Sequence, residues 1–359
     1  MRLAVFSRYT RKGASSRLRM MQYGDWLAAE GFSFHVRPLF DDGYLENLYA
    51  GRSRYGSTLK AYARRFRDLY HFRNDHDVYW IEKEMFPWVP AGLEEALLPR
   101  RLPVVSDYDD AVFHRYDLHP RVMVRRFLRD KIDRVMAASA LVTAGNRYLA
   151  HRARAAGAGR VEIVPTVVDI NRYQPGPDNN DTSTPVIGWI GTPGTWAEYM
   201  QPMLPLLTDV ADQHGAEIWA VGAGALRDLH PRLKVLPWTE ETEGDLIGSM
   251  DIGIMPLSDS PWSRGKCGYK LIQYMACGLP VVASPVGVNT EIVEPNVNGF
   301  LATSQAEWRD ALMHLIRDAA LRRRMGFEGR RKIEAEFSLQ VWAPRVAQLF
   351  REVVGQGWL

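Results

Sequence analysis

Short apolar runs recur along the first half of the chain, and glycine turns and amphipathic segments separate them. The first run, Arg2–Ser7, is followed by a turn at Lys12–Arg17 and by a helical pattern over 16–30. A buried strand, a glycine turn and a helix in this order are typical of the opening of a doubly wound domain. Five later runs predict further strands: Phe32–Val36, Val78–Ile81, Pro103–Ser106, Leu141–Ala144 and Val161–Val164. Because they alternate with helical segments, we expect a parallel sheet with helices on both faces.

The same alternation resumes after residue 185. Four apolar runs predict strands at Val186–Ile190, Glu217–Val221, Lys234–Leu236 and Ile252–Met255. Amphipathic periodicity predicts three helices near the end of the chain, over 308–316, 321–337 and 339–354. The intervening segment Gln174–Pro185 is rich in turn formers and lacks apolar residues, which is typical of a linker.

A chain of 359 residues exceeds one ordinary core, so two domains are expected. We place Rossmann-like domains at 1–180 and 181–338, followed by a terminal helix at 339–359. The only cysteines, Cys267 and Cys277, offer neither a disulfide framework nor zinc-ligand spacing, and no run of 18 apolar residues occurs. Together with an initial apolar run too short for a signal peptide, these features favour a cytoplasmic protein.

Charge is unevenly distributed between the two halves. Residues 1–180 hold 29 Lys and Arg against 21 Asp and Glu, whereas residues 181–359 hold 16 against 21. A basic first half indicates an anionic partner, and both nucleic acid and a phospholipid surface fit the charge alone.

Candidate chemistry concentrates in the stretch 264–287. Cations and glycines lead into a short helix, which is followed by an apolar strand and another glycine turn. Cations, backbone N–H groups and a helix N-terminus at one point are how proteins bind phosphate or diphosphate. We therefore expect Arg264, Lys266 and Lys270 to bind a diphosphate, while Gly268 lets the ligand approach the backbone.

The segment Gly268–Ala283 resembles the E-x-M-A-x-G-x-P-V-V-A pattern of GT-B glycosyltransferases, close to the retaining group called family 4. Weaker matches occur at Val164–Asp169, Gly188–Gly191, Val221–Gly224 and Asn298–Phe300. The resemblance implies two Rossmann-like domains whose parallel sheets face each other across a cleft, with the C-terminal helix packing back on the first domain. It also implies sugar transfer from a nucleotide-sugar donor to a hydroxyl of a glycan, glycolipid or lipid-linked acceptor, without a metal or other cofactor.

The resemblance extends to individual donor contacts. Gln273 stands where relatives have a glutamate that binds the ribose hydroxyls, and Gly265 stands where they have an earlier glutamate. The loops that face the donor supply further expected contacts: Gly13, Arg17, Gly191, Thr192 and Gly194. Arg19 is an alternative to Arg17 for reaching the diphosphate. In retaining transfer the leaving diphosphate accepts the proton of the incoming hydroxyl, so the protein mainly stabilises charge, and Lys270 is the candidate catalytic cation.

Two neighbouring strand ends carry acidic side chains. Tyr108, Asp109 and Asp110 follow one predicted strand, and crowded carboxylates raise one another's pKa, which is typical of functional sites. By alignment Tyr108 replaces a histidine that touches the sugar in relatives, and Asp109 or Asp110 would lie nearest the reaction. The alternative is an acidic turn that caps a helix. Glu82 and Glu84 end another strand and are candidates for contacts with the acceptor hydroxyl.

Two basic segments with aromatic or leucine faces, 59–73 and 119–135, lie in the basic half. This combination is typical of helices that bind anionic membrane surfaces, and it predicts peripheral association with the inner face of a membrane. Alternatively, both faces pack on the sheet and the arginines stay solvated.

Four other interpretations of the function are weaker. A catalytically silent GT-B nucleotide-binding protein is favoured by Gly265 and by the lack of Arg or Lys near Gly194. A GT-B sugar-nucleotide epimerase is opposed by the stretch 264–287. Nucleic-acid binding does not explain that stretch and is not expected, and a dinucleotide oxidoreductase would need G-x-G-x-x-G around Gly13.

Overall fold

The computed structural model describes residues 1–49, 52–53, 55–72, 75–98, 102–176, 184–226 and 229–355. The chain divides into two compact units. Unit 1 comprises Met1–Thr166, Gly265–Cys267 and Trp342–Leu359, and unit 2 comprises Val167–Arg264 and Gly268–Val341. The boundary that we placed at 180, and most of the expected linker, lie outside the described residues.

Unit 1 is built on a six-stranded parallel sheet of order β2-β1-β3-β4-β5-β6. Its strands are β1 (Arg2–Phe6), β2 (Ser33–Val36), β3 (Val78–Glu82), β4 (Val104–Tyr108), β5 (Leu141–Ala144) and β6 (Val161–Ile163). All six strands were predicted from apolar runs. The central strands read as continuous apolar runs because both of their faces are buried.

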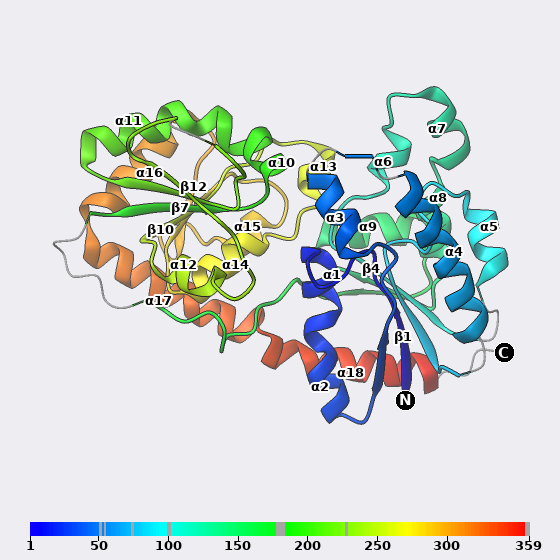
Figure 1. Ribbon diagram of the computed structural model, residues 1–359. Coiled ribbons are helices and arrows are strands. Elements are labelled where there is room, and N and C mark those ends of the chain that lie inside the picture. The colour runs from blue at the N-terminus through cyan, green and yellow to red at the C-terminus, as the bar shows by residue number, and fades with distance from the viewer. Residues whose placement is uncertain are drawn as a thin grey trace. The chain divides into compact units, whose positions relative to one another are not determined.

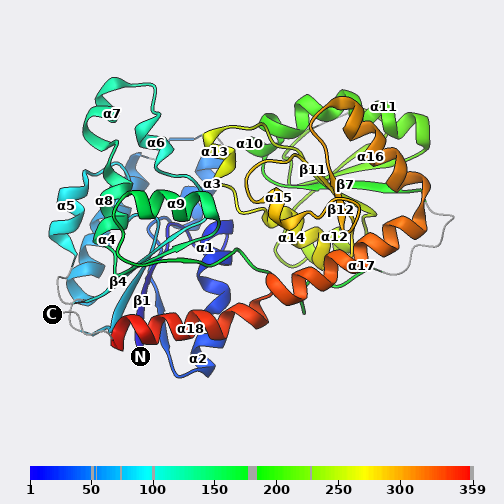
Figure 2. The ribbon, with the colours of Figure 1, turned by 180° about the vertical axis from the view of Figure 1, so that it is seen from behind.

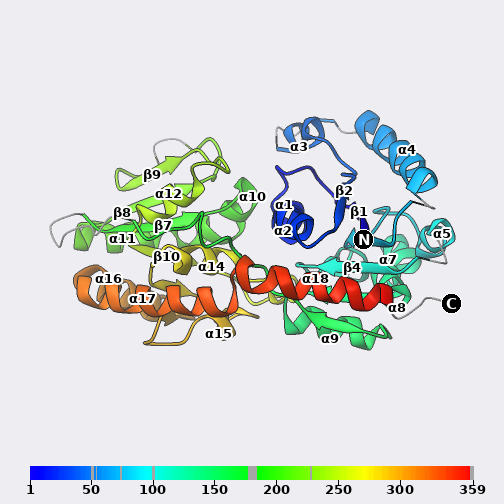
Figure 3. The same ribbon diagram turned by 90° about the horizontal axis from the view of Figure 1, so that it is seen from below.

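Helices cover both faces of this sheet. They are α1 (Ala14–Arg19), the short 3₁₀ turn η1 (Met21–Tyr23), α2 (Gly24–Ala29), α3 (Asp42–Tyr49), α4 (Tyr55–Phe72), α5 (Ala91–Leu97), α6 (His114–Asp117), α7 (Val122–Leu128), α8 (Lys131–Ala138) and α9 (Arg147–Ala155). On one face Leu69 of α4 packs with Tyr79 and Ile81 of β3. On the other, Trp80 contacts Phe350 of α18 (Leu339–Gly355), which runs across the sheet of unit 1 (Figure 3).

The predicted helix over 16–30 is interrupted. The chain leaves helical geometry at Met20 (φ −128°, ψ −64°) and continues as η1 and α2. Residues 16–20 are all buried. Five consecutive buried side chains point in every direction around a helix, so this turn is surrounded on all sides and does not have the single apolar face that a periodic pattern assumes.

Unit 2 has a second parallel sheet, of order β12-β11-β10-β7-β8-β9. Its strands are β7 (Val186–Ile190), β8 (Glu217–Val221), β9 (Leu233–Leu236), β10 (Ile252–Met255), β11 (Val281–Ala283) and β12 (Gly299–Leu301). Its helices are α10 (Pro193–Thr195), the π-helix η2 (Trp196–Met200), η3 (Gln201–Met203), α11 (Leu204–His214), α12 (Glu243–Gly248), α13 (Pro261–Arg264), α14 (Tyr269–Ala276), α15 (Asn289–Ile292), α16 (Gln305–Arg317) and α17 (Ala319–Glu336).

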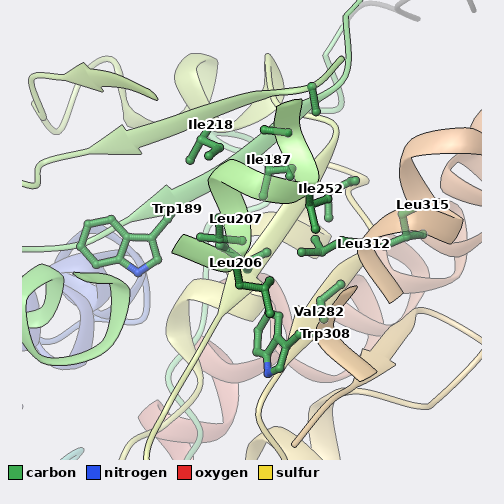
Figure 4. Packing of buried hydrophobic residues seen from close by; sticks show 14 of the residues in the cluster. Ile187, Trp189, Leu206, Leu207, Ile218, Ile252, Val282, Trp308, Leu312 and Leu315 are labelled. Carbon is green, nitrogen blue, oxygen red and sulfur yellow. The ribbon is translucent and has the colours of Figure 1, made fainter. Parts of the chain in front are cut away.

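Two apolar clusters bury the faces of this second sheet. Helices α11 and α16 lie on one face, and α12 and α14 lie on the other (Figure 1). Figure 4 shows Leu207 of α11 near Ile187, and Leu206 beside Trp308 of α16, in the cluster that also contains Ile252. Two six-stranded parallel sheets, each with helices on both faces, confirm the predicted fold class. The sequence analysis missed β12, because a three-residue strand that begins with glycine has too few apolar positions to be recognised.

Candidate functional site

Each parallel sheet has one place where neighbouring strands are followed by connections that leave in opposite directions. In unit 1 this switch point lies between β1 and β3, and in unit 2 it lies between β7 and β10. Ligands of doubly wound folds bind outside the carboxyl ends of the strands at such points. Most of the residues singled out from the sequence follow these strand ends.

Glycine turns end β7 and β8 in unit 2. Gly222 has a positive φ of 77°, and a Cβ atom there would lie 2.3 Å from the carbonyl oxygen of Gly191. Glycine is therefore required for the two turns to lie against each other. The loop after Gly191 is fixed by a capping box between Thr192 and Thr195, whereas a Cβ atom at Gly194 would meet nothing closer than 4.0 Å. The N–H of Gly191 already donates to the carbonyl of Val221, and those of Thr192 and Thr195 donate to each other's hydroxyls.

Lys270 lies in the first turn of α14, close to the turn that follows β7. Its Nζ is 5.9 Å from the centroid of the Trp189 ring, and a Cβ atom at Gly191 would be 2.4 Å from Cζ2 of that ring. Trp189 thus joins the Gly191 turn to the start of α14. Gly268 precedes the helix with φ +66°, a conformation that favours glycine. The structure therefore brings together Gly191, Gly268 and Lys270, three of the expected donor contacts.

The segment just before α14 explains one departure from the glycosyltransferase pattern. A Cβ atom at Gly265 would lie 2.5 Å from Cβ of Ala111 and 2.7 Å from its backbone nitrogen, so a glutamate does not fit there. Asn146 Nδ2 donates to the carbonyls of Gly265 and Lys266 at 3.0 and 2.9 Å, which fixes the backbone. The exposed Arg264 pairs with the exposed Asp259 at 2.7 Å.

Gln273 is buried, and its side chain is already engaged in unit 2. Its Nε2 donates to Tyr173 at 3.0 Å, and Tyr173 donates to Glu243 at 2.6 Å. The carboxylate of Glu243 is therefore linked, through the hydroxyl of Tyr173, to the position where relatives carry a glutamate. The contact of Gln273 with a ribose stays a prediction.

A buried ammonium organises the acidic edge of unit 1. Lys83 has a left-handed backbone (φ 66°), and its Nζ lies 2.8 Å from Asp109 Oδ1, 3.6 Å from Asp110 Oδ2 and 3.3 Å from Ser15 Oγ. A left-handed lysine costs about 1 kcal/mol or more, and such strain tends to occur at functional sites. Glu82 Oε2 accepts hydrogen bonds from Ser16 and from the backbone N–H of Arg8 at 2.6 and 2.7 Å.

The two adjacent aspartates are driven toward different protonation states. Burial opposes the ionisation of Asp109, but Lys83 and Arg19 outweigh it, and the pKa of Asp109 lies below its usual range. Burial and the charge of Asp109 together raise the pKa of Asp110, against the effect of Lys83. Burial likewise raises the pKa of Glu82. Neighbouring carboxylates with separated pKa values are typical of acid–base sites.

Other predicted acidic-edge residues are enclosed by the protein. Glu84 lies 2.9 Å from Lys131 and 3.4 Å from Arg8, and it accepts a hydrogen bond from Tyr116 at 2.8 Å. Although burial works against ionisation, Lys131 and Arg8 hold the pKa of Glu84 below its usual value. Tyr108 is the last residue of β4 and is fully buried, and burial raises its pKa well above the usual value. The structure therefore places Tyr108 and Glu84 inside unit 1, while Asp109 and Asp110 stay partly exposed.

The glycine turn of unit 1 is also tightly built. A Cβ atom at Gly13 would lie 2.5 Å from Cβ of Tyr9, so glycine is needed for packing. Arg17 is buried and donates to the carbonyl of Arg11 at 3.3 Å. The alternative, Arg19, is engaged internally, because it makes two hydrogen bonds to Asp107 at 2.7 and 2.9 Å and one to the carbonyl of Val164.

Sequence reasoning missed Lys83, Glu243 and Tyr173. Lys83 was detectable as a cation between two acids at a strand end, but Glu243 and Tyr173 carry no local signal. Within the described residues, no three His, Cys, Asp or Glu side chains are grouped so that they could hold a metal ion. Among the described helices, none is long and apolar enough to cross a membrane.

Comparison with protein families gives one match, in unit 2. Residues 184–318 match the family model described as "Glycosyl transferases group 1". Comparison with the sequences of curated proteins finds no significant match.

Solved structures with similar folds cover nearly the whole chain. Sucrose-phosphate synthase from Thermosynechococcus elongatus has a TM-score of 0.74 at 16% identity, over 99% of this chain and 100% of that one. HepE of Anabaena in complex with UDP-glucose has a TM-score of 0.69 at 18% identity, over 99% and 100%. WaaG, a glycosyltransferase involved in lipopolysaccharide biosynthesis, has a TM-score of 0.67 at 12% identity, over 98% and 99%. These likenesses show a GT-B fold. The fold and the group 1 domain over residues 184–318 together support a glycosyltransferase.

Proposed function

We propose that this protein transfers a sugar from a nucleotide-sugar donor to a hydroxyl of a glycan, glycolipid or lipid-linked acceptor, with retention of configuration, as a family 4 enzyme of surface polysaccharide or glycoconjugate synthesis. The observation that carries the proposal is that Lys270, in the first turn of α14, lies near the ring of Trp189, which also packs on the Gly191 turn. A diphosphate needs positive charge and backbone N–H groups, and Lys270 and the first turn of α14 would supply both. The UDP-glucose bound to HepE supports a nucleotide sugar as the ligand.

In this proposal the protein acts by charge stabilisation and orientation. Lys270, with Arg264 and Lys266, would neutralise the leaving diphosphate without a metal ion. Asp109 and Asp110 would orient the acceptor hydroxyl at the edge of unit 1, since they are the carboxylates of that cluster that remain partly exposed.

The proposal includes an anionic membrane surface at the cytoplasmic face, contacted through α7. Figures 1 and 2 show α7 at the tip of a loop that projects from the body of unit 1. Val122, Met123 and Phe127 are largely exposed there, beside the exposed Arg121 and Arg126. Apolar side chains ringed by cations fit the boundary between lipid headgroups and acyl chains.

The donor assignment is tested by substituting Lys270. Lys270→Met keeps the aliphatic stem and removes the charge, and we expect sugar transfer or donor hydrolysis to fall by about a hundredfold or more. Lys234 is a matched control in the same unit, because its Nζ is also 5.9 Å from a tryptophan ring, that of Trp219. Lys234→Met should leave activity unchanged. Full activity of the Lys270 variant would refute the diphosphate assignment.

The rival functions are separated by nucleotide binding and turnover. Thermal stabilisation by one of the UDP-, GDP-, ADP- or CMP-linked sugars would identify the donor, because a ligand that binds the folded state raises the melting temperature. Binding without transfer or hydrolysis would favour the silent protein. Conversion of the sugar while it remains on the nucleotide would favour the epimerase.

A further inference from the structure

A chain of hydrogen-bonded side chains in unit 2 leads away from Gln273. Tyr173 accepts from Gln273 at 3.0 Å and donates to Glu243 Oε1 at 2.6 Å. Glu243 Oε2 accepts from Nε1 of Trp238 at 2.8 Å. Gln273, Tyr173 and Glu243 are each 3% exposed. Both oxygens of one buried carboxylate therefore hold ring systems in place, a tyrosine on one side and a tryptophan on the other.

The tryptophan at the end of this chain lies at the edge where the donor residues gather. Trp238 follows the last residue of β9 by two positions and is half-buried. A Cβ atom at Gly222 would lie 3.2 Å from Cβ of Trp238 and 2.3 Å from the carbonyl oxygen of Gly191. The Cβ atom of Trp238 is thus adjacent to the paired glycine turns, at the carboxyl end of the sheet.

The energetic cost of this arrangement indicates a function. Burying a carboxylate is unfavourable unless its oxygens accept hydrogen bonds. What the carboxylate provides is a fixed indole, since the Trp238 N–H has a defined partner. A pre-oriented aromatic plane loses little conformational entropy when a flat ligand stacks on it. Nucleobases are flat and stack on aromatic side chains without requiring a particular sequence of polar contacts.

We propose that Trp238 is the stacking platform for the nucleobase of the donor, and that Glu243 and Tyr173 are positioning residues that hold this platform and Gln273 in one arrangement. The inference rests on the proposed function, because it takes a nucleoside diphosphate or its sugar ester as the ligand. A single carboxylate then sets the geometry of the base contact and of the predicted ribose contact together.

The platform is tested by calorimetric titration with UDP, GDP, ADP and CMP, followed by variants with the nucleotide that the unmodified protein binds most tightly. Trp238→Ala should lower the affinity for that nucleotide by between about fivefold and a hundredfold. Trp238→Phe, which keeps a ring, should lower it by no more than about threefold. Trp219→Ala is the matched control, because Trp219 is also half-buried and donates to a glutamate, Glu217, at 3.0 Å. It should bind the nucleotide normally.

The positioning role is tested with Tyr173→Phe, which keeps the ring and breaks the chain between Glu243 and Gln273. Nucleotide affinity should fall severalfold while affinity for inorganic pyrophosphate is unchanged, whereas a merely structural defect would lower both.

The possible failures are distinguishable. Unaltered nucleotide binding by Trp238→Ala, or a Trp238→Phe variant as weak as Trp238→Ala, would overturn the platform. An unmodified protein that binds none of the four nucleotides would instead overturn the proposed function itself.

Discussion

Helices α4 and α7 carry the same sequence signal, arginines beside aromatic and aliphatic residues, yet the fold uses them differently. In α4, Arg65 is 2% exposed and donates to the carbonyls of Ser7 and Arg37 at 2.7 and 3.1 Å. In α7, Met123 is 62% and Phe127 60% exposed, and only Leu128 of that helix is buried among its described residues. The charge of α4 is thus partly structural, although Leu59 and Tyr70 of that helix are each 75% exposed, whereas α7 buries only Leu128 among its described residues.

The segment 119–135 itself divides at the end of α7. Arg129 is exposed, but Lys131, two residues later, is fully buried between Glu84 and Glu94 at 2.9 and 3.2 Å. A basic amphipathic pattern therefore cannot distinguish a cation that meets a partner from one that neutralises a buried acid. The difference lies in which strands and helices the fold places opposite the helix.

The largest expected effect is a difference in stability between substitutions of Lys131 and of Arg129. Lys131→Ala leaves Glu84 and Glu94 buried without their shared cation, and we expect a loss of about 3–5 kcal/mol in the free energy of unfolding. Arg129→Ala should change it by less than about 0.5 kcal/mol. Chemical denaturation followed by circular dichroism measures both. Equal stability of the two variants would contradict the distinction between a buried, structural Lys131 and an exposed Arg129.

A smaller effect is expected within α4. Arg65→Ala should cost about 1–3 kcal/mol, because it leaves buried carbonyl oxygens without their donor. Arg67, exposed on the same helix, is the matched position, and Arg67→Ala should be nearly neutral. If Arg67→Ala lowered the melting temperature as much as Arg65→Ala, the structural reading of α4 would be wrong.

Membrane contact should depend on α7 and not on α4. Phe127→Glu places a charge at the proposed lipid boundary, and we expect binding to vesicles containing anionic phospholipid to fall by about tenfold or more, with an unchanged melting temperature. Tyr70→Glu on α4, where Tyr70 is also well exposed, is the control and should bind normally. Co-sedimentation with vesicles measures the difference, and equal losses in both variants would assign the surface to α4 as well.

The smallest effect concerns the charge around that apolar tip. Arg126→Gln should weaken vesicle binding by about 1 kcal/mol, or roughly fivefold, at low ionic strength. The loss should shrink at high salt, because exposed charges are screened. Titration of vesicles at two salt concentrations tests this, and a loss that does not depend on salt would argue against an electrostatic contact.

The sequence by itself determined the two sheets apart from β12, because buried parallel strands are continuous apolar runs between helices, and all six strands of unit 1 were found in this way. It also located the stretch 264–287, since glycines and cations before a helix leave a local signature. Tertiary structure decided which charged residues remain accessible. Lys83, Lys131 and Arg65 are buried among partners that lie far away in the chain, and Glu243 meets Tyr173 across 70 residues. Such pairings depend on which strand ends and helices the fold brings together, and no local pattern encodes them.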